Sequence, residues 1–218
     1  MKKSKTLGLA VLVLFLTTGG YSQNATQSID LSTVQNDQAW YSYNLEATYN
    51  EEEQFVQVQG GDGHAILWLN DFSFENGTIE ADIRGKNIPG KSFVGIAFHG
   101  VDQQQYDAVY FRPFNFAGSR QQFSVQYISY PDKNWSYLRE NFPGKYESRL
   151  TSVPDPVDTW FHVTIEVNHP SVKVYVNNDA KPSLEFEQLR SERKVGFIGL
   201  WVDNGSTGDF KNIVVKSK

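Results

Sequence analysis

The sequence predicts an all-β domain, either a sandwich or a barrel, from two observations. First, no helical apolar stripe of useful length occurs in the 218 residues. Second, short runs of alternating apolar and polar residues recur along the chain, and turn residues separate them. The chain is long enough for one such domain with an ample core, and no repeat or linker marks a second domain.

The predicted strands are short runs that fit this alternation. In chain order they are Phe55–Val58, Ala65–Leu69, Gly77–Arg84, Ser92–His99, Tyr106–Arg112, Gln122–Ile128, Trp160–Val167, Val172–Val176, Ser183–Phe186, Val195–Val202 and Asp209–Val215. Residues with turn chemistry lie between them, as in Glu75-Asn76-Gly77, Ile88-Pro89-Gly90, Asn168-His169-Pro170 and Asn177-Asn178-Asp179. The longest segment between two predicted strands is Ser129–Thr159, which contains four prolines. Loops that long are more often functional than accidental.

The first 22 residues have the pattern of a cleavable signal peptide. Three lysines precede the apolar run Leu7–Leu16, which is too short to span a bilayer, and Gly20-Tyr21-Ser22 offers small residues for cleavage. We therefore expect residues 23–218 to form a single secreted or periplasmic domain without a membrane anchor. The chain has no cysteine, which excludes a lipidated amino terminus, disulfides, a thiol nucleophile and Cys-ligated zinc.

The charge balance argues against nucleic acid as a partner. The chain has 20 basic and 25 acidic residues, for a net charge of −5. Without the three leader lysines, 17 basic residues remain and the net charge becomes −8. An acidic surface without a lysine-rich run suits neither nucleic acid nor an anionic membrane. Aromatic residues make up 14% of the chain, more than an average core needs, so some are expected to contact a ligand.

Strand phase sorts the side chains into two sets. The apolar set, expected between two sheets, is Ile79, Ala81, Ile83, Val94, Ile96, Phe98, Phe123, Val125, Tyr127, Phe161, Val163, Ile165 and Val167. The opposite set places small residues such as Gly95 beside large polar ones such as Tyr110 and Arg112. Small side chains next to large ones on the same face of a sheet leave a groove. A sandwich has two outer faces, so the pattern leaves open whether all strands contribute to the same one.

The segment Tyr106–Asn115 predicts the chemistry of that groove. Its outward row combines two tyrosines with Arg112. Aromatic rings stack on the C–H face of a sugar, and fixed donors bind its hydroxyls or a carboxylate. The alternative interpretation is structural: the rings cover a neighbouring strand and Arg112 pairs with a carboxylate.

Several segments resemble the concanavalin A-like lectin/glucanase superfamily, whose fold is a jelly-roll β-sandwich of two antiparallel sheets. They are residues 74–84 (FENGTIEADIR), 92–98 (SFVGIAF), 160–167 (WFHVTIEV), 172–177 (VKVYVN), 196–201 (GFIGLW) and 208–213 (GDFKNI). Their order is similar to that of laminin-G-like secreted bacterial modules. The resemblance implies the fold and leaves the function open, because the superfamily includes lectins, binding modules, hydrolases and lyases.

The sequence does not support the mechanism of the family 16 glycoside hydrolases. These enzymes carry Glu-x-Asp-x-Glu on one strand, and retaining enzymes need two carboxyl groups about 5–5.5 Å apart. Residues 80–84 (EADIR) are similar, but Arg84 stands where the second glutamate is required. In the strand at the catalytic place the single acid is Asp107, out of phase with Tyr106 and Tyr110.

Two alternatives to a glycan-binding protein remain. The first is a glycoside hydrolase that resembles the 3-keto-disaccharide hydrolases and uses Asp107, Glu147 or His99 as proton carriers. The chain lacks their Asn-Gly-Lys-Asp-Leu type segment near the amino terminus, so this resemblance implies the fold only. The second is a structural or adhesion protein that acts through a sheet edge.

No metal or cofactor is expected. The histidines have no metal-ligand spacing. Similar jelly rolls often bind calcium near their terminal strands, for which Asp203-Asn204-Gly205 and Asp209 are the candidates here. However, Lys211 occupies the position where such chains often carry an aspartate.

The sequence therefore predicts a secreted protein that binds a poly- or oligosaccharide. The expected groove residues are Tyr106, Tyr110, Arg112, Asn115, Gln126, His99 and Asp107. The expected lid or edge residues, from the long loop, are Trp135, Arg139, Tyr146 and Glu147. This hypothesis requires the rings and donors to be displayed to water.

Overall fold

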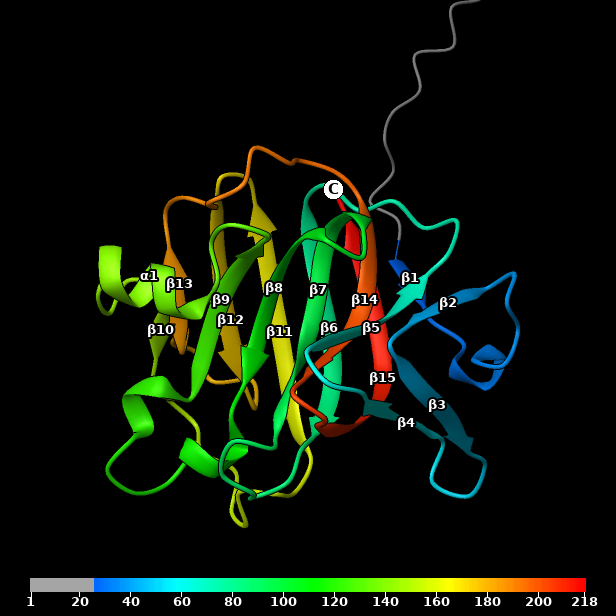
Figure 1. Cartoon of the computed structure of the whole chain (residues 1–218), viewed down its shortest axis with the longest axis horizontal. Helices are drawn as coiled ribbons and strands as arrows, with labels where there is room; N and C mark the ends of the chain where they lie inside the picture. Colours follow the sequence, from blue (N-terminus) through cyan, green and yellow to red (C-terminus); the bar gives the residue numbers. More distant parts are fainter. Residues whose placement is uncertain (1–25) are drawn as a thin grey trace, which may run out of the picture.

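The computed structural model describes residues 26–218, which form two antiparallel sheets packed face to face as a jelly-roll β-sandwich (Figure 1). Sheet A consists of β1 (Thr26–Ser28), β3 (Leu45–Asn50), β4 (Phe55–Gly60), β6 (Gly77–Arg84), β11 (Phe161–Asn168), β12 (Ser171–Val176), β13 (Leu184–Phe186) and β15 (Thr207–Ser217). Its order is β13-β12-β11-β6-β15-β4-β3, and β1 pairs with β15.

Sheet B consists of β2 (Trp40–Tyr43), β5 (His64–Leu69), β7 (Phe93–Asp102), β8 (Gln105–Phe111), β9 (Val125–Tyr130), β10 (Glu147–Ser148) and β14 (Phe197–Asp203). Its order is β10-β9-β8-β7-β14-β5-β2. Short helices accompany the sheets: the α-helix α1 (Trp135–Asn141) and the 3-10 turns η1 (Leu31–Thr33), η2 (Pro113–Asn115) and η3 (Gln121–Phe123). In Figure 1, β8, β7 and β14 of sheet B lie in front of β11, β6 and β15 of sheet A.

The core between the sheets arises from the alternation that the sequence showed. In sheet A, Ile83 lies opposite Phe161, and both point into the core. In sheet B, Ile96 pairs with Val109 in the same way. Burying such side chains contributes about 1.5–3 kcal/mol each. All members of the predicted apolar set are buried except Phe123, which lies in η3 and is half-exposed.

The two outer faces of the sandwich differ in chemistry. The outer face of sheet A is polar, with ion pairs such as Lys216–Glu80 at 2.6 Å. The outer face of sheet B carries a second buried apolar cluster. Its members are Ile66, Trp68, Ala97, Tyr106, Ala108, Tyr110, Ile128 and Trp201. Glu80 and the tyrosine row, which the sequence could not assign to one face, therefore lie on opposite faces of the molecule.

The structure differs from the predicted elements mainly at the edges. It adds β1, β2 and β3, and the long segment Ser129–Thr159 holds α1 and β10. The side chain of Asn134 caps α1 by accepting a hydrogen bond from the Tyr137 backbone N–H at 3.0 Å. Residues 122–124 belong to or directly follow η3, so β9 begins only at Val125.

Two further predictions concern the membrane and the leader. No helix within residues 26–218 is long and apolar enough to cross a bilayer. The predicted signal peptide, residues 1–22, lies outside the described residues.

Candidate functional site

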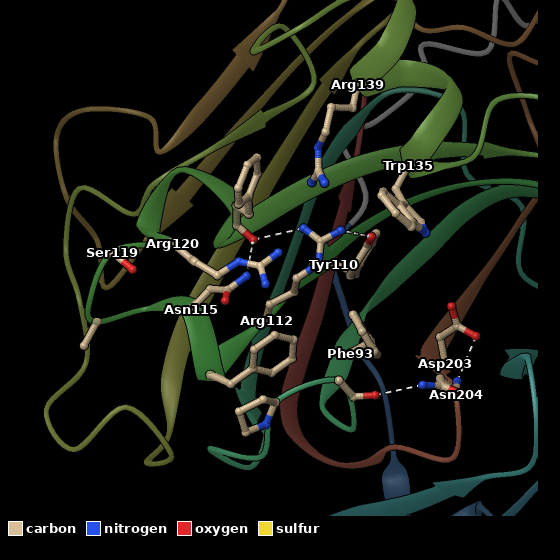
Figure 2. A pocket seen from close by; sticks show the side chains of 15 residues that line it. Phe93, Tyr110, Arg112, Asn115, Ser119, Arg120, Trp135, Arg139, Asp203 and Asn204 are labelled. Carbon is tan, nitrogen blue, oxygen red and sulfur yellow. Dashed lines mark hydrogen bonds between the residues drawn. The ribbon is translucent and has the colours of Figure 1, made fainter.

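A pocket of about 650 Å³ opens on the outer face of sheet B. It lies where β8 and β14 end and β7 begins, with η2 and η3 on one side and α1 on another (Figure 2). The lining residues are Pro89, Gly90, Phe93, Tyr110, Arg112, Phe114, Asn115, Ala117, Ser119, Arg120, Phe123, Trp135, Arg139, Asp203 and Asn204. Five aromatic rings and three arginines are therefore gathered in one concave site.

Tyr110 and Gly95 build the floor. The Tyr110 ring packs against Trp201, with 4.8 Å between the ring centroids. Gly95 lies directly opposite Tyr110 on β7, and a Cβ atom at position 95 would lie 2.5 Å from the Tyr110 Cα. Only glycine permits this close approach of the two strands, because real Cβ atoms are not found at such distances.

Arg112 extends from the end of β8 into the centre of the pocket (Figure 2). Its Nη1 donates to the Phe123 carbonyl at 2.9 Å, and its Nη2 donates to the Tyr110 hydroxyl. The guanidinium lies 4.7 Å from the centroid of the Tyr110 ring. Burial lowers the pKa of Arg112, and the nearby charge of Arg139 lowers it further. An arginine stays charged despite such a shift, so a cation is held at the floor of the pocket.

Helix α1 supplies the wall with Trp135 and Arg139. The Arg139 guanidinium lies between the rings of Phe123 and Trp135, at 4.0 and 4.9 Å from their centroids. Its Nε donates to Glu147 Oε1 at 2.9 Å, and its Nη2 donates to Oε2 at 2.5 Å. This bidentate pair joins α1 to β10 and neutralises the charge of Arg139.

The opposite rim comes from the end of β14. Asn204 Nδ2 donates to the Gly90 carbonyl at 2.8 Å, which ties the β14–β15 turn to the loop before β7. Asp203 is the one carboxylate among the residues that line the pocket. Burial raises the pKa of Asp203. The sequence singled out Asp203 and Asn204 only as calcium candidates, because they are distant in the chain from the Tyr106–Asn115 segment.

Five residues that the sequence assigned to the site line this pocket. They are Tyr110, Arg112, Asn115, Trp135 and Arg139. Gln126 and Glu147 lie on the same cross-strand row as Tyr110, on β9 and β10, but they are buried and do not line the pocket. Tyr106 is on the same face and also buried, where its hydroxyl accepts a hydrogen bond from Trp201 Nε1 at 3.1 Å.

The expectation that these rings and donors are displayed to water is wrong for most of them. Tyr110 and Arg112 are 2% and 5% exposed, and Asn115 is also buried. The physical reason is that large rings on the outer face of sheet B cover one another, while η2, η3 and α1 wall in the pocket. Trp135, which is 46% exposed, is the ring that does face solvent.

His99, Asp107 and Tyr146 lie elsewhere. His99 follows a register shift in β7 and has a φ of 50°, and its Nε2 contacts the Glu75 carbonyl at 2.8 Å. Asp107 points inward and accepts hydrogen bonds from Tyr127 Oη and Ser191 Oγ at 2.7 and 2.6 Å.

The hydroxyl of Tyr146, the remaining lid residue, donates to the Gln188 carbonyl at 2.9 Å. The side chains of His99, Asp107 and Tyr146 therefore do not line the pocket.

The calcium candidates are in different surroundings. Asp209 is held by Arg84 at 2.8 Å and by Gln57 at 2.9 Å on sheet A. Within residues 26–218 no group of three or more histidine, aspartate or glutamate side chains is arranged to hold a metal.

Comparison with solved structures confirms the class of the fold. The carbohydrate-binding module CBM66 from Bacillus subtilis superimposes with a TM-score of 0.57 and 18% identity over 82% of this chain and 95% of its own. A Bacillus subtilis protein of unknown function with a galectin-like fold gives a TM-score of 0.57 and 13% identity over 86% of this chain and 91% of its own. The exoplasmic/lumenal domain of VIP36 bound to Ca²⁺ and Man3GlcNAc gives a TM-score of 0.56 and 11% identity over 83% of each chain.

The chain thus has a jelly-roll fold of the galectin-like kind. It belongs to the family of 3-keto-alpha-glucoside-1,2-lyase-like domains, whose model matches residues 24–216. The expectation that the likeness to 3-keto-disaccharide hydrolases is one of fold only is therefore wrong, since the sequence itself matches the family. A search of curated proteins gives no match.

Proposed function

We propose that the protein binds a glycan in the pocket on the outer face of sheet B. The observation that carries this proposal is the pairing of the half-exposed Trp135 ring with fixed polar groups on the same concave surface. The indole offers a stacking plane for a sugar ring. Arg112, Asn204 and Asp203 offer donors and an acceptor for its hydroxyls.

The similar proteins support this proposal. One is a carbohydrate-binding module, and VIP36 is bound to a mannose-containing glycan. The family description refers to a 3-keto-glucoside, which is also a sugar. The hydrolase alternative lacks comparable support from its suggested proton carriers. Asp107 and His99 do not line the pocket, and Glu147 is paired with Arg139.

A glycan array with the purified protein tests this function, and Trp135→Ala is the informative variant. Trp135 is 46% exposed, so its loss should leave the fold intact while reducing retention on the cognate glycan at least about tenfold. Phe197→Ala is the matched control. Phe197 is 41% exposed and lies at the other end of the strand that carries Asp203, about 20 Å away. Equal binding by both variants would contradict the proposed site.

We also propose that the protein acts outside the cytoplasm after removal of residues 1–22. Mass spectrometry of the protein from its native host should give a chain that starts near Gln23. A chain that retains residues 1–22 would contradict this proposal.

A further inference from the structure

Arg112 is a buried cation whose direct partners are neutral. Its side chain is held by a backbone carbonyl and a tyrosine hydroxyl. Within residues 26–218 no aspartate or glutamate oxygen lies within 4 Å of its guanidinium. Buried charges are normally paired, because removing an ion from water is costly. The structure thus holds a desolvated positive charge at a pocket floor without a counterion from the described chain.

Three of the four half-buried arginines within residues 26–218 show the usual arrangement, whereas the fourth, Arg190, lies over the Phe142 ring without a carboxylate within 4 Å. Arg84 pairs with Asp209 at 2.8 Å, Arg139 with Glu147 at 2.5 Å, and Arg193 with Asp107 at 3.5 Å. Arg112 is more deeply buried than any of these four, and yet it lacks the carboxylate that three of them have.

Arg120 adds a second positive charge to this part of the pocket. It follows η2 along the chain, it is exposed, and within residues 26–218 it too has no carboxylate within 4 Å. Figure 2 shows its side chain beside Asn115, on the side of the pocket where Arg112 bonds to the Phe123 carbonyl. The charge of Arg120 also contributes to the lowered pKa of Arg112, after burial and Arg139.

The pocket is consequently positive in an acidic protein. Two arginines without a carboxylate partner face a single lining aspartate, Asp203, while the whole chain has a net charge of −5. No lysine lines the pocket, so its positive charge comes from arginines alone. Arginine forks match the planar or tetrahedral oxygens of carboxylate and sulfate groups.

We infer that the ligand of this pocket is an acidic saccharide, whose carboxylate or sulfate group binds between Arg112 and Arg120 while its ring stacks on Trp135. This inference rests on the proposed glycan-binding function and adds the charge of the ligand to it. The anion supplies the counterion that Arg112 lacks, and the aromatic lining accounts for the sugar ring that carries it.

Isothermal titration of the whole protein with paired oligosaccharides tests the inference. Uronic-acid oligosaccharides and sulfated galactans are each compared with their carboxyl-reduced or desulfated counterparts. We expect an acidic member to bind at least about tenfold more tightly than its neutral counterpart, because charge-assisted hydrogen bonds are worth that difference. The preference should shrink in high salt.

Variants assign the effect to the pocket. Arg120→Gln should weaken the binding of the acidic member far more than that of its neutral counterpart, and so remove most of the acidic preference. Arg149→Gln, at an exposed arginine outside the pocket, should change neither affinity. Equal loss in both variants would overturn the inference, since it would reflect general surface charge.

The outcomes separate the inference from the function beneath it. If neutral glycans bind as tightly as acidic ones and Trp135→Ala abolishes both, glycan binding stands and the acidic preference is overturned. If no saccharide of either kind binds, both proposals fail. If inorganic sulfate alone binds as tightly as the acidic saccharide, the sugar ring contributes nothing and the inference is overturned.

Discussion

Arg139 on α1 and Glu147 on β10 form a two-pronged ion pair at the wall of the pocket, with N···O distances of 2.9 and 2.5 Å. The seven residues between them fold back so that the helix is held against the edge of sheet B. The pair positions Trp135, because the Arg139 guanidinium lies against the Trp135 ring. A salt bridge thus links the edge strand to the ring proposed to stack on the ligand.

Glu147→Gln should lower the free energy of unfolding by about 1–3 kcal/mol. The variant leaves the half-buried Arg139 without a carboxylate, since the amide cannot neutralise its charge. Urea denaturation measures the change. Glu140→Gln is the matched control, because Glu140 is exposed on the same helix and makes no ion pair within the described residues, so it should shift stability by less than about 0.5 kcal/mol. Equal stability of both variants would show that the pair does not hold α1.

Tyr110→Ala should destabilise the fold by about 3–5 kcal/mol, because it removes a buried ring from its contact with Trp201. Tyr110→Phe keeps the ring and loses only the hydroxyl that accepts from Arg112, so it should cost about 1 kcal/mol. Thermal unfolding of the two variants separates packing from hydrogen bonding. Similar melting temperatures for Tyr110→Ala and the unmodified protein would mean that this ring is not packed as described.

The free energy of unfolding should depend on pH through the titration of Asp203. Burial raises its pKa above the ordinary value of 3.8. The folded state therefore holds the proton more tightly than the unfolded state, and stability falls as the pH rises through the folded pKa.

Asp203→Asn removes this titration and should be more stable than the unmodified protein at pH 7. The advantage should vanish below the ordinary pKa of 3.8. The amide oxygen can still accept the hydrogen bond from the Asn204 N–H that Asp203 Oδ1 accepts now. Unfolding curves across pH, with Asp132→Asn as the exposed control, measure the difference. A constant difference at all pH values would contradict the raised pKa.

Strand phase predicted much of this molecule. It assigned Tyr106 and Tyr110 to one face and Val94, Ile96 and Phe98 to the other, as the structure has them. Period two is a local property of the backbone, so it can be found from a single strand.

Strand phase could not predict that other side chains cover the outer face of sheet B. Burial of Tyr110 depends on Trp201 from β14 and on the close approach at Gly95, which are contacts between segments distant in the chain. Asp203 was missed as a pocket residue for the same reason. His99 was placed on the wrong face because the register of β7 shifts after Phe98, and alternation fails at such an irregularity.

The distribution of apolar residues along the chain did not predict helix α1 either. Seven residues are too few to show an apolar stripe, and α1 buries only Leu138. Its one local signal is Asn134, a residue type that favours the N-cap position.

The most direct measurement for the account is an NMR titration of the five tryptophan indole signals with a glycan retained on the array. Binding in the proposed pocket should shift the Trp135 signal strongly and leave that of Trp160 unchanged, since Trp160 lies over Arg84 of sheet A, away from the pocket. A glycan that shifts Trp160 without moving Trp135 would place the binding site elsewhere and contradict the account.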